Sequence, residues 1–272
     1  GNLLGNIIGG GLILMAFSWL QWHGALWLLA ALICVSLIQM VMFREPSADD
    51  NMNPSLVEKA PILKDVVAFI GQHKRWFLAM ALYPIASACG FALINPMLVD
   101  AGWQLEDIGF VLKIFGSIVG LFSALLATPL LTYLGREKAL MSVVVAQFCA
   151  LLMMIPIALG HTDKVMVYSA ITLHFISFPA TLVVTSTIIM DKAALTQRKA
   201  TFFALQFSFA SMLGFAYSSL SMALAERIGY SSVIMAGALL SFLIVLVMGF
   251  VLGLKAAIFS EGDATRLLEY DR

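Results

Sequence analysis

Two ionisable side chains lie inside long apolar runs of the sequence, where an uncompensated charge is costly. Lys113 interrupts the stretch GFVLKIFGSIVG (residues 109–120), and His174 lies near the middle of the run 165–190. A charge inside a bilayer costs about 2.5–3.5 kcal/mol on insertion scales, so ionisable groups there are functional candidates by default. A lysine could attract an anionic group of a solute. A histidine could exchange a proton between about pH 5 and 8.

Small residues share the helical face of Lys113, and bulky residues face the opposite way, with Phe110 as the exception. At the period of an α-helix the small face holds Gly109, Gly116, Ser117, Gly120, Ala124 and Ala127. The bulky face holds Val111, Ile114, Phe115, Ile118, Phe122 and Leu125. Small faces pack closely in membranes, so Lys113 is predicted to point into protein or a watery cavity. The alternative is that its long stem snorkels to the membrane surface.

The helical face of His174 is small and rich in hydroxyl groups: it also carries Ala170, Ser177, Thr181 and Thr185. Such a stripe is typical of a face that meets a cavity or a neighbouring helix. His174 is therefore a candidate for solute binding or proton coupling. The alternative interpretation is a neutral histidine that is hydrogen-bonded to another helix.

Three further polar residues are candidates for lining a solute cavity. Gln206 and Tyr217 are eleven residues apart and share a face of the run 200–225. Asn95 precedes Pro96, where a break in the helix would free backbone groups for binding or gating; a simple end of the helix is the alternative.

The composition indicates an all-α polytopic membrane protein. The chain is 61% hydrophobic and only 12% charged, whereas soluble domains carry about 25% charged residues. Runs of about 18 or more apolar residues are candidates for transmembrane helices. Eight such runs are predicted, at residues 1–20, 24–43, 76–99, 107–133, 139–159, 165–190, 200–225 and 230–254. The lipid bilayer is the partner that these runs imply, and a net charge of zero gives no case for nucleic acid.

Basic residues fall mainly on one side of the predicted runs. One set of turns and the tail hold 13 of the 16 lysines and arginines; the other set holds only Lys164 and Arg227, and Lys113 is the remaining one. The positive-inside rule places the first set in the cytoplasm. The linker 44–75 and the C-terminus are therefore predicted to be cytoplasmic, in an inner membrane.

The order of the runs predicts four parts. Residues 1–43 form the last two helices of a first bundle, and residues 44–75 form a linker with an amphipathic helix that starts near Pro61. Residues 76–254 form a six-helix second bundle, and residues 255–272 form a tail. The chain starts inside an apolar run without a methionine, so we expect that an N-terminal part of the protein is missing from it.

The sequence contains no enzyme signature that we recognise. It lacks H-E-x-x-H, G-x-S-x-G and G-x-x-x-x-G-K-[ST]. We therefore predict no catalytic residue, no metal site and no cofactor. Without a nucleotide-binding loop, transport driven by an ion gradient is the simplest function, and a proton is the expected coupling ion. A membrane sensor that transports nothing remains open.

Several stretches resemble the major facilitator superfamily. Residues 1–10, GNLLGNIIGG, are similar to its glycine motif in the fifth helix: Gly1, Gly5, Gly9 and Gly10 match, and Asn6 replaces the usual proline. The turn LGREKAL is similar to the basic loop between helices 8 and 9, where Arg136 and Lys138 match but the aspartate and second glycine do not. Residues 101–120 and KATFFALQFS (199–208) resemble AmpG-type muropeptide permeases and related siderophore permeases.

The resemblance implies a function as well as a fold. It implies a secondary active transporter that imports a polar or amphipathic small solute, of the muropeptide or metal–siderophore class, by alternating access. It also implies a matching lysine at Lys113 that meets an anionic solute, and a cytoplasmic gate in which Arg136 pairs with Asp191. The glycines of the motif, with Gly116 and Gly120, are expected at close helix contacts. An exporter of drugs or metabolites from the same superfamily is the alternative.

Overall fold

The computed structural model describes residues 5, 13, 17–42 and 62–253, and every element in these residues is a helix. Most of the predicted linker and the tail, together with Gly1, Gly9 and Gly10, lie outside the described residues. The chain divides into two compact units: residues 1–74 with 104–117, and residues 75–103 with 118–272. Each unit is considered by itself.

Among the residues that the structure describes, the first unit has the helical elements α3, α4, α7 and η3. Helix α3 (Phe17–Met42) includes one non-helical residue, Gln21. Helix α4 (Ile62–Gln72) occupies the stretch where a short amphipathic helix is predicted. Helix α7 (Leu105–Gly109) continues directly into η3 (Phe110–Phe115), which is a π-helix.

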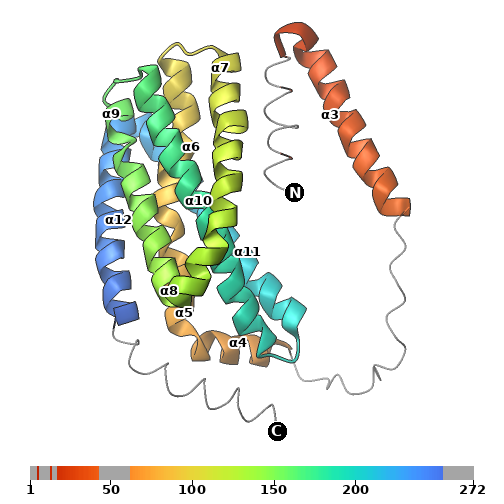
Figure 1. Cartoon of the computed structure of the whole chain (residues 1–272), viewed down its shortest axis with the longest axis vertical. Coiled ribbons are helices and arrows are strands. Elements are labelled where there is room, and N and C mark those ends of the chain that lie inside the picture. Colours follow the sequence, from red (N-terminus) through yellow and green to blue (C-terminus); the bar gives the residue numbers. More distant parts are fainter. Residues whose placement is uncertain (1–4, 6–12, 14–16, 43–61, 254–272) are drawn as a thin grey trace. The chain divides into compact units, whose positions relative to one another are not determined.

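The second unit is a bundle of long helices that run up and down (Figure 1). It consists of α5 (Lys74–Leu82), α6 (Pro84–Asp100), α8 (Gly116–Leu152), α9 (Ile155–Ala158), α10 (Lys164–Ala194), α11 (Lys199–Ile228) and α12 (Tyr230–Gly253). Helix α6 packs against α11 and α12, and α10 packs against α11. The core therefore lies along α6, which the neighbouring helices cover.

Helix α8 is two helices that reverse direction at one residue. Gly135 has φ 74° and ψ 171°, a backbone conformation that glycine adopts at little cost. The predicted runs 107–133 and 139–159 therefore meet in a turn centred on Gly135 (Figure 1). Arg136, which follows the turn, begins the second half of α8.

Six helical stretches in the described residues are long and apolar enough to cross a membrane. One of them, Leu105–Ala158, has 54 residues and contains the reversal at Gly135, so it accounts for two of the predicted runs. The first predicted run lies largely outside the described residues. The membrane character of the chain is thus supported, and the number of eight spans stays a prediction.

Hydrogen bonds show which interhelical connections of the second unit lie at the same end of the bundle. The indole Nε1 of Trp103 donates to the carbonyl of Thr162 (3.1 Å), and the Tyr230 hydroxyl donates to Asp100 (2.7 Å). These bonds gather the turns after α6, before α10 and before α12 at one end. Lys164 and Arg227 belong to this end, while Arg136, Lys138, Lys192, Arg198 and Lys199 belong to the other. The charge asymmetry of the sequence is therefore an asymmetry between two ends of a bundle.

Two expectations about helix ends and faces are wrong. Helix α6 continues through Pro96 to Asp100, so the Asn95–Pro96 pair neither breaks the helix nor ends it. Val111 was placed on the bulky face opposite the small packing face of Lys113, but it is fully buried. The reason is η3: a π-turn holds about one residue more than an α-turn, so it rotates the residues before it relative to those after it. After the π-turn the expected pattern holds, with Ser117 and Ala127 buried and Ile118, Phe122 and Leu125 exposed.

Close glycine packing occurs at a position that the sequence motifs did not single out. A Cβ atom added to Gly90 would lie 2.7 Å from Met154 Sδ and 2.8 Å from Leu151 Cδ1, so α6 and the end of α8 approach closely there. Gly116 and Gly120 are buried. A Cβ atom added to Gly5 would meet no atom within 4 Å.

Candidate functional site

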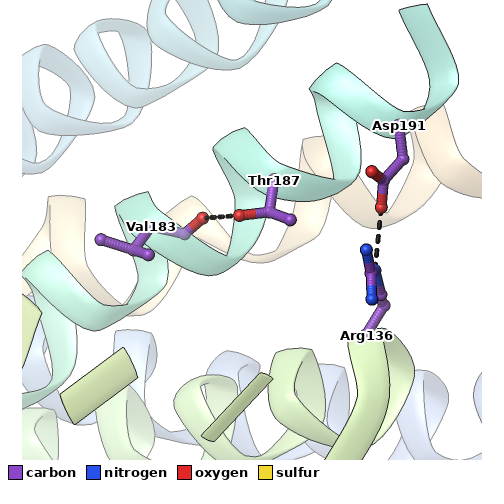
Figure 2. A network of polar contacts seen from close by, with 4 residues as sticks. All are labelled: Arg136, Val183, Thr187 and Asp191. Atoms are coloured by element: carbon purple, nitrogen blue, oxygen red, sulfur yellow. Dashed lines mark hydrogen bonds and ion pairs between the residues drawn. The ribbon is translucent and has the colours of Figure 1, made fainter. Parts of the chain in front are cut away.

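An ion pair joins α8 to α10 at one end of the second unit. The guanidinium Nε of Arg136 lies 2.9 Å from Oδ2 of Asp191, and both side chains are about half exposed (56% and 48%). Arg136 is the first residue after the Gly135 turn, and Asp191 lies in the last turns of α10 (Figure 2). The structure thus contains the ion pair that the resemblance implies. Lys138, the third predicted gate residue, is exposed nearby in the sequence.

A buried hydrogen bond joins α5 to α11 at the same end. The indole Nε1 of Trp76 donates to Oε1 of Gln206 at 2.8 Å. Gln206 is fully buried, and its amide nitrogen donates to the backbone carbonyls of Phe202 (2.9 Å) and Ile189 (3.5 Å). Its side chain therefore binds helices together rather than facing an open cavity.

His174 lies among phenylalanine rings. Its ring stacks on Phe91 of α6 with a centroid distance of 4.3 Å and on Phe178 at 5.5 Å, and it meets Phe175 edge to face. The side chain is 4% exposed, and Nε2 has no hydrogen-bond partner among the described residues. A buried polar atom without a partner costs about 1–3 kcal/mol, so this nitrogen needs an explanation.

The hydroxyl stripe of α10 is buried, as its pattern predicts, but it bonds mainly within its own helix. Ser177 donates to the carbonyl of His174, Thr181 to that of Ser177, and Thr185 to that of Thr181. Each hydroxyl thus uses its proton locally, which is how serine and threonine are commonly accommodated inside helices. The stripe faces neighbouring helices, and Ser123 of α8 donates across to the carbonyl of Ile176.

Gln147 is a buried polar residue that the sequence analysis missed. Its Nε2 donates to Oγ1 of Thr181 at 2.8 Å, which joins the second half of α8 to α10, and its Oε1 has no partner among the described residues. The only sequence signal was an amide in the middle of the apolar run 139–159. Two buried atoms without described partners therefore lie at one face of α10: Nε2 of His174, which belongs to α10, and Oε1 of Gln147, which packs against it.

The remaining two cavity candidates differ in environment. The Tyr217 hydroxyl donates to the carbonyl of Ala81 at 2.8 Å, next to the bend where α5 ends at Leu82 and α6 begins at Pro84. Proline offers no backbone N–H, so side chains that bond carbonyls near such a bend stabilise it. Asn95 is exposed on α6.

Lys113 lies in the π-helix η3. The N–H of Gly116 bonds the carbonyl of Val111, five residues earlier, which defines the wider turn. Lys113 is half-buried, and no hydrogen bond or ion pair joins it to another described residue. Short π-turns inside helices are frequently found at functional sites. Ser117, one turn later, is fully buried and its hydroxyl also lacks a described partner.

Two open cavities in the second unit are lined by other residues. One, of about 420 Å³, lies between Met153 and the first half of α10, where Tyr168, Ser169, Thr172, Leu173 and Ile176 line it. The other, of about 560 Å³, lies where α6, α11 and α12 meet, and Glu226 is the charged residue in its wall. Neither contains a residue that the sequence predicts to bind solute. Of the predicted residues, the Arg136–Asp191 pair and Gln206 lie at the same end of the bundle without touching, and the others lie at separate positions along the helices.

Comparison with known proteins identifies the family. The model of the Major Facilitator Superfamily matches residues 1–219. An anhydromuropeptide permease of Escherichia coli (strain K12) is 31% identical over 147 residues, which make up 52% of this chain and 29% of the permease. The permease of Escherichia coli O157:H7 gives the same values. The matched part thus spans less than a third of those relatives. Since the family model covers most of the chain, the chain belongs to the major facilitator superfamily.

Proposed function

We propose that the chain is part of a carrier that imports a polar or amphipathic solute across the inner membrane by alternating access. The observation that carries this proposal is the 31% identity to an anhydromuropeptide permease over 147 residues. The proposed solute is therefore a muropeptide. A metal–siderophore complex is the second candidate solute. The linker and C-terminus are proposed to be cytoplasmic, in agreement with the basic end of the bundle.

Uptake of a labelled solute tests this function. Vesicles that contain the full-length protein should accumulate a labelled anhydromuropeptide when the outside is acidified, and a protonophore should abolish most of the accumulation. A ferric siderophore, offered in parallel, distinguishes the second class. If neither solute accumulates above vesicles without the protein, the proposed function is wrong.

The Arg136–Asp191 pair is proposed to hold the cytoplasmic side of the carrier closed. It joins two helices at the basic end, and its partners are far apart in sequence but 2.9 Å apart in space. An exposed pair contributes roughly 0–1 kcal/mol. Such a contribution is small for folding, but it shifts a nearly balanced equilibrium between two conformations by up to about fivefold.

Charge reversal should open the inner side of the carrier. We expect Arg136→Asp and Asp191→Arg each to raise the labelling rate of a cysteine in the cytoplasmic half by about two- to fivefold. The double reversal should restore the low rate because it rebuilds the attraction. Reversal of the neighbouring Glu137 to lysine is the control and should change little. Additive effects in the double variant would rule out the pair as a gate.

Lys113 is proposed to bind an anionic group of the solute. Lys113→Gln should weaken the apparent solute affinity by about tenfold or more, because hydrogen bonds to charged groups contribute about 1.5–3 kcal/mol. Lys113→Arg keeps the charge and should retain part of the affinity. Lys164→Gln, at the exposed start of α10, is the matched control. An unchanged affinity in Lys113→Gln, with normal protein in the membrane, would show that Lys113 only snorkels.

His174 is proposed to take part in proton coupling. His174→Ala should lower uptake and weaken its dependence on pH, because the substitution removes an imidazole that can bind and release a proton. His174→Phe separates coupling from packing, because a third ring refills the space between Phe91 and Phe178. If His174→Phe restores both the rate and the pH profile, the role of His174 is packing alone.

A further inference from the structure

The two inter-helix contacts at the basic end are linked through the last turns of α10. Asp191 pairs with Arg136 of α8, and two residues earlier the carbonyl of Ile189 accepts a hydrogen bond from Nε2 of Gln206 on α11 (3.5 Å). Gln206 in turn accepts the indole proton of Trp76 on α5 (2.8 Å). Four helices, α5, α8, α10 and α11, are thus joined in one chain of contacts.

Lys192 adds a second contact between α10 and α5. Its Nζ lies 5.8 Å from the centroid of the Trp76 ring, within the range of a cation–π interaction. Trp76 is 8% exposed, so its ring is a fixed surface inside the bundle rather than a residue at the lipid boundary. The indole therefore meets α11 with its N–H group and α10 with its face.

The residues of α10 that make these contacts point in different directions. At the helical period, Asp191 is nearly opposite Ile189, and Lys192 lies on the side of Ile189. One side of α10 is therefore held by Trp76 and Gln206, and the opposite side presents Asp191 to Arg136. The rotation of α10 about its own axis decides whether the Asp191 carboxylate reaches the guanidinium.

The two sets of contacts differ in strength. Arg136 and Asp191 are about half exposed, so water competes for both partners. The Trp76–Gln206 bond is buried, and breaking it would leave a donor and an acceptor without water to replace the partner. The buried bond is thus suited to persist while the exposed pair opens and closes.

We propose that Trp76 and Gln206 are positioning residues for the Arg136–Asp191 gate. They fix the rotation of the last turns of α10 so that Asp191 faces Arg136. This inference rests on the gating role proposed above. It also reassigns Gln206: the amide whose oxygen and nitrogen already bond Trp76, Phe202 and Ile189 orients a helix rather than binding solute.

A double-mutant cycle tests the positioning role in the full-length protein. Trp76→Phe keeps an aromatic face below Lys192 but removes the proton that Gln206 accepts. The readout is the labelling rate of a cysteine in the cytoplasmic half, in variants with and without Arg136→Gln. Arg136→Gln alone should raise that rate by about two- to fivefold. In the Trp76→Phe background the same substitution should change the rate by less than about twofold, because Asp191 is no longer held towards Arg136.

Trp103→Phe is the matched control. Trp103 also donates its indole proton to a bond between distant segments, with the carbonyl of Thr162, but at the opposite end of the bundle. In this background Arg136→Gln should keep its full effect. Gln206→Met is a second test variant with a similar shape, in case Trp76→Phe is poorly produced, and it should also remove the effect.

The outcomes separate positioning from simple stabilisation. If Trp76→Phe and Gln206→Met lower thermal stability but leave the effect of Arg136→Gln at full size, the positioning role is wrong. The labelling rate does not depend on the solute, so the test remains valid if uptake assays reject the proposed solutes. An absence of any effect of Arg136→Gln in the native background would contradict the gate itself.

Discussion

The scarcity of water inside a bilayer constrains this structure more than any other condition. Each polar group that enters the apolar region must find a partner within the protein, because the lipid supplies none. The hydroxyls of α10 bond carbonyls of their own helix, and Tyr217 bonds a carbonyl beside the bend at Pro84. The indole of Trp76 and the amide of Gln206 satisfy each other. A few buried polar atoms, among them His174 Nε2 and Gln147 Oε1, have no partner among the described residues. They are therefore exceptions to this rule.

The same constraint explains which features the sequence could predict. Long apolar runs must be helical, so the helices and the segregation of basic residues to one end followed from composition and order. The Arg136–Asp191 pair was expected from the resemblance of the LGREKAL turn to a basic loop of the superfamily, and the structure joins the two side chains at 2.9 Å. The buried stripe of α10 was predicted from its period, although its hydroxyls bond locally.

The missed features depend on contacts between distant helices or on a local change of helix type. Trp76 and Gln206 are 130 residues apart, and no spacing rule connects them. Gln147 and Gly90 gain their roles only from the helix that faces them. No sequence motif in Phe110–Phe115 signals a π-turn. The α-helical period therefore placed Val111 on the wrong face. A single sequence reports periods within a helix, whereas the rotation of each helix against its neighbours is a property of the packed bundle.

The turn at Gly135 has a mechanical consequence. Two helices joined through a single residue in a left-handed conformation have almost no slack between them. A displacement of the first half of α8 along its axis is therefore passed directly to Arg136, without a loop to absorb it. An insertion of even a few residues at this turn would decouple the two halves, while insertions in the longer connection between α9 and α10 would not. The short turn at Gly135 thus couples the position of Arg136 to that of the first half of α8.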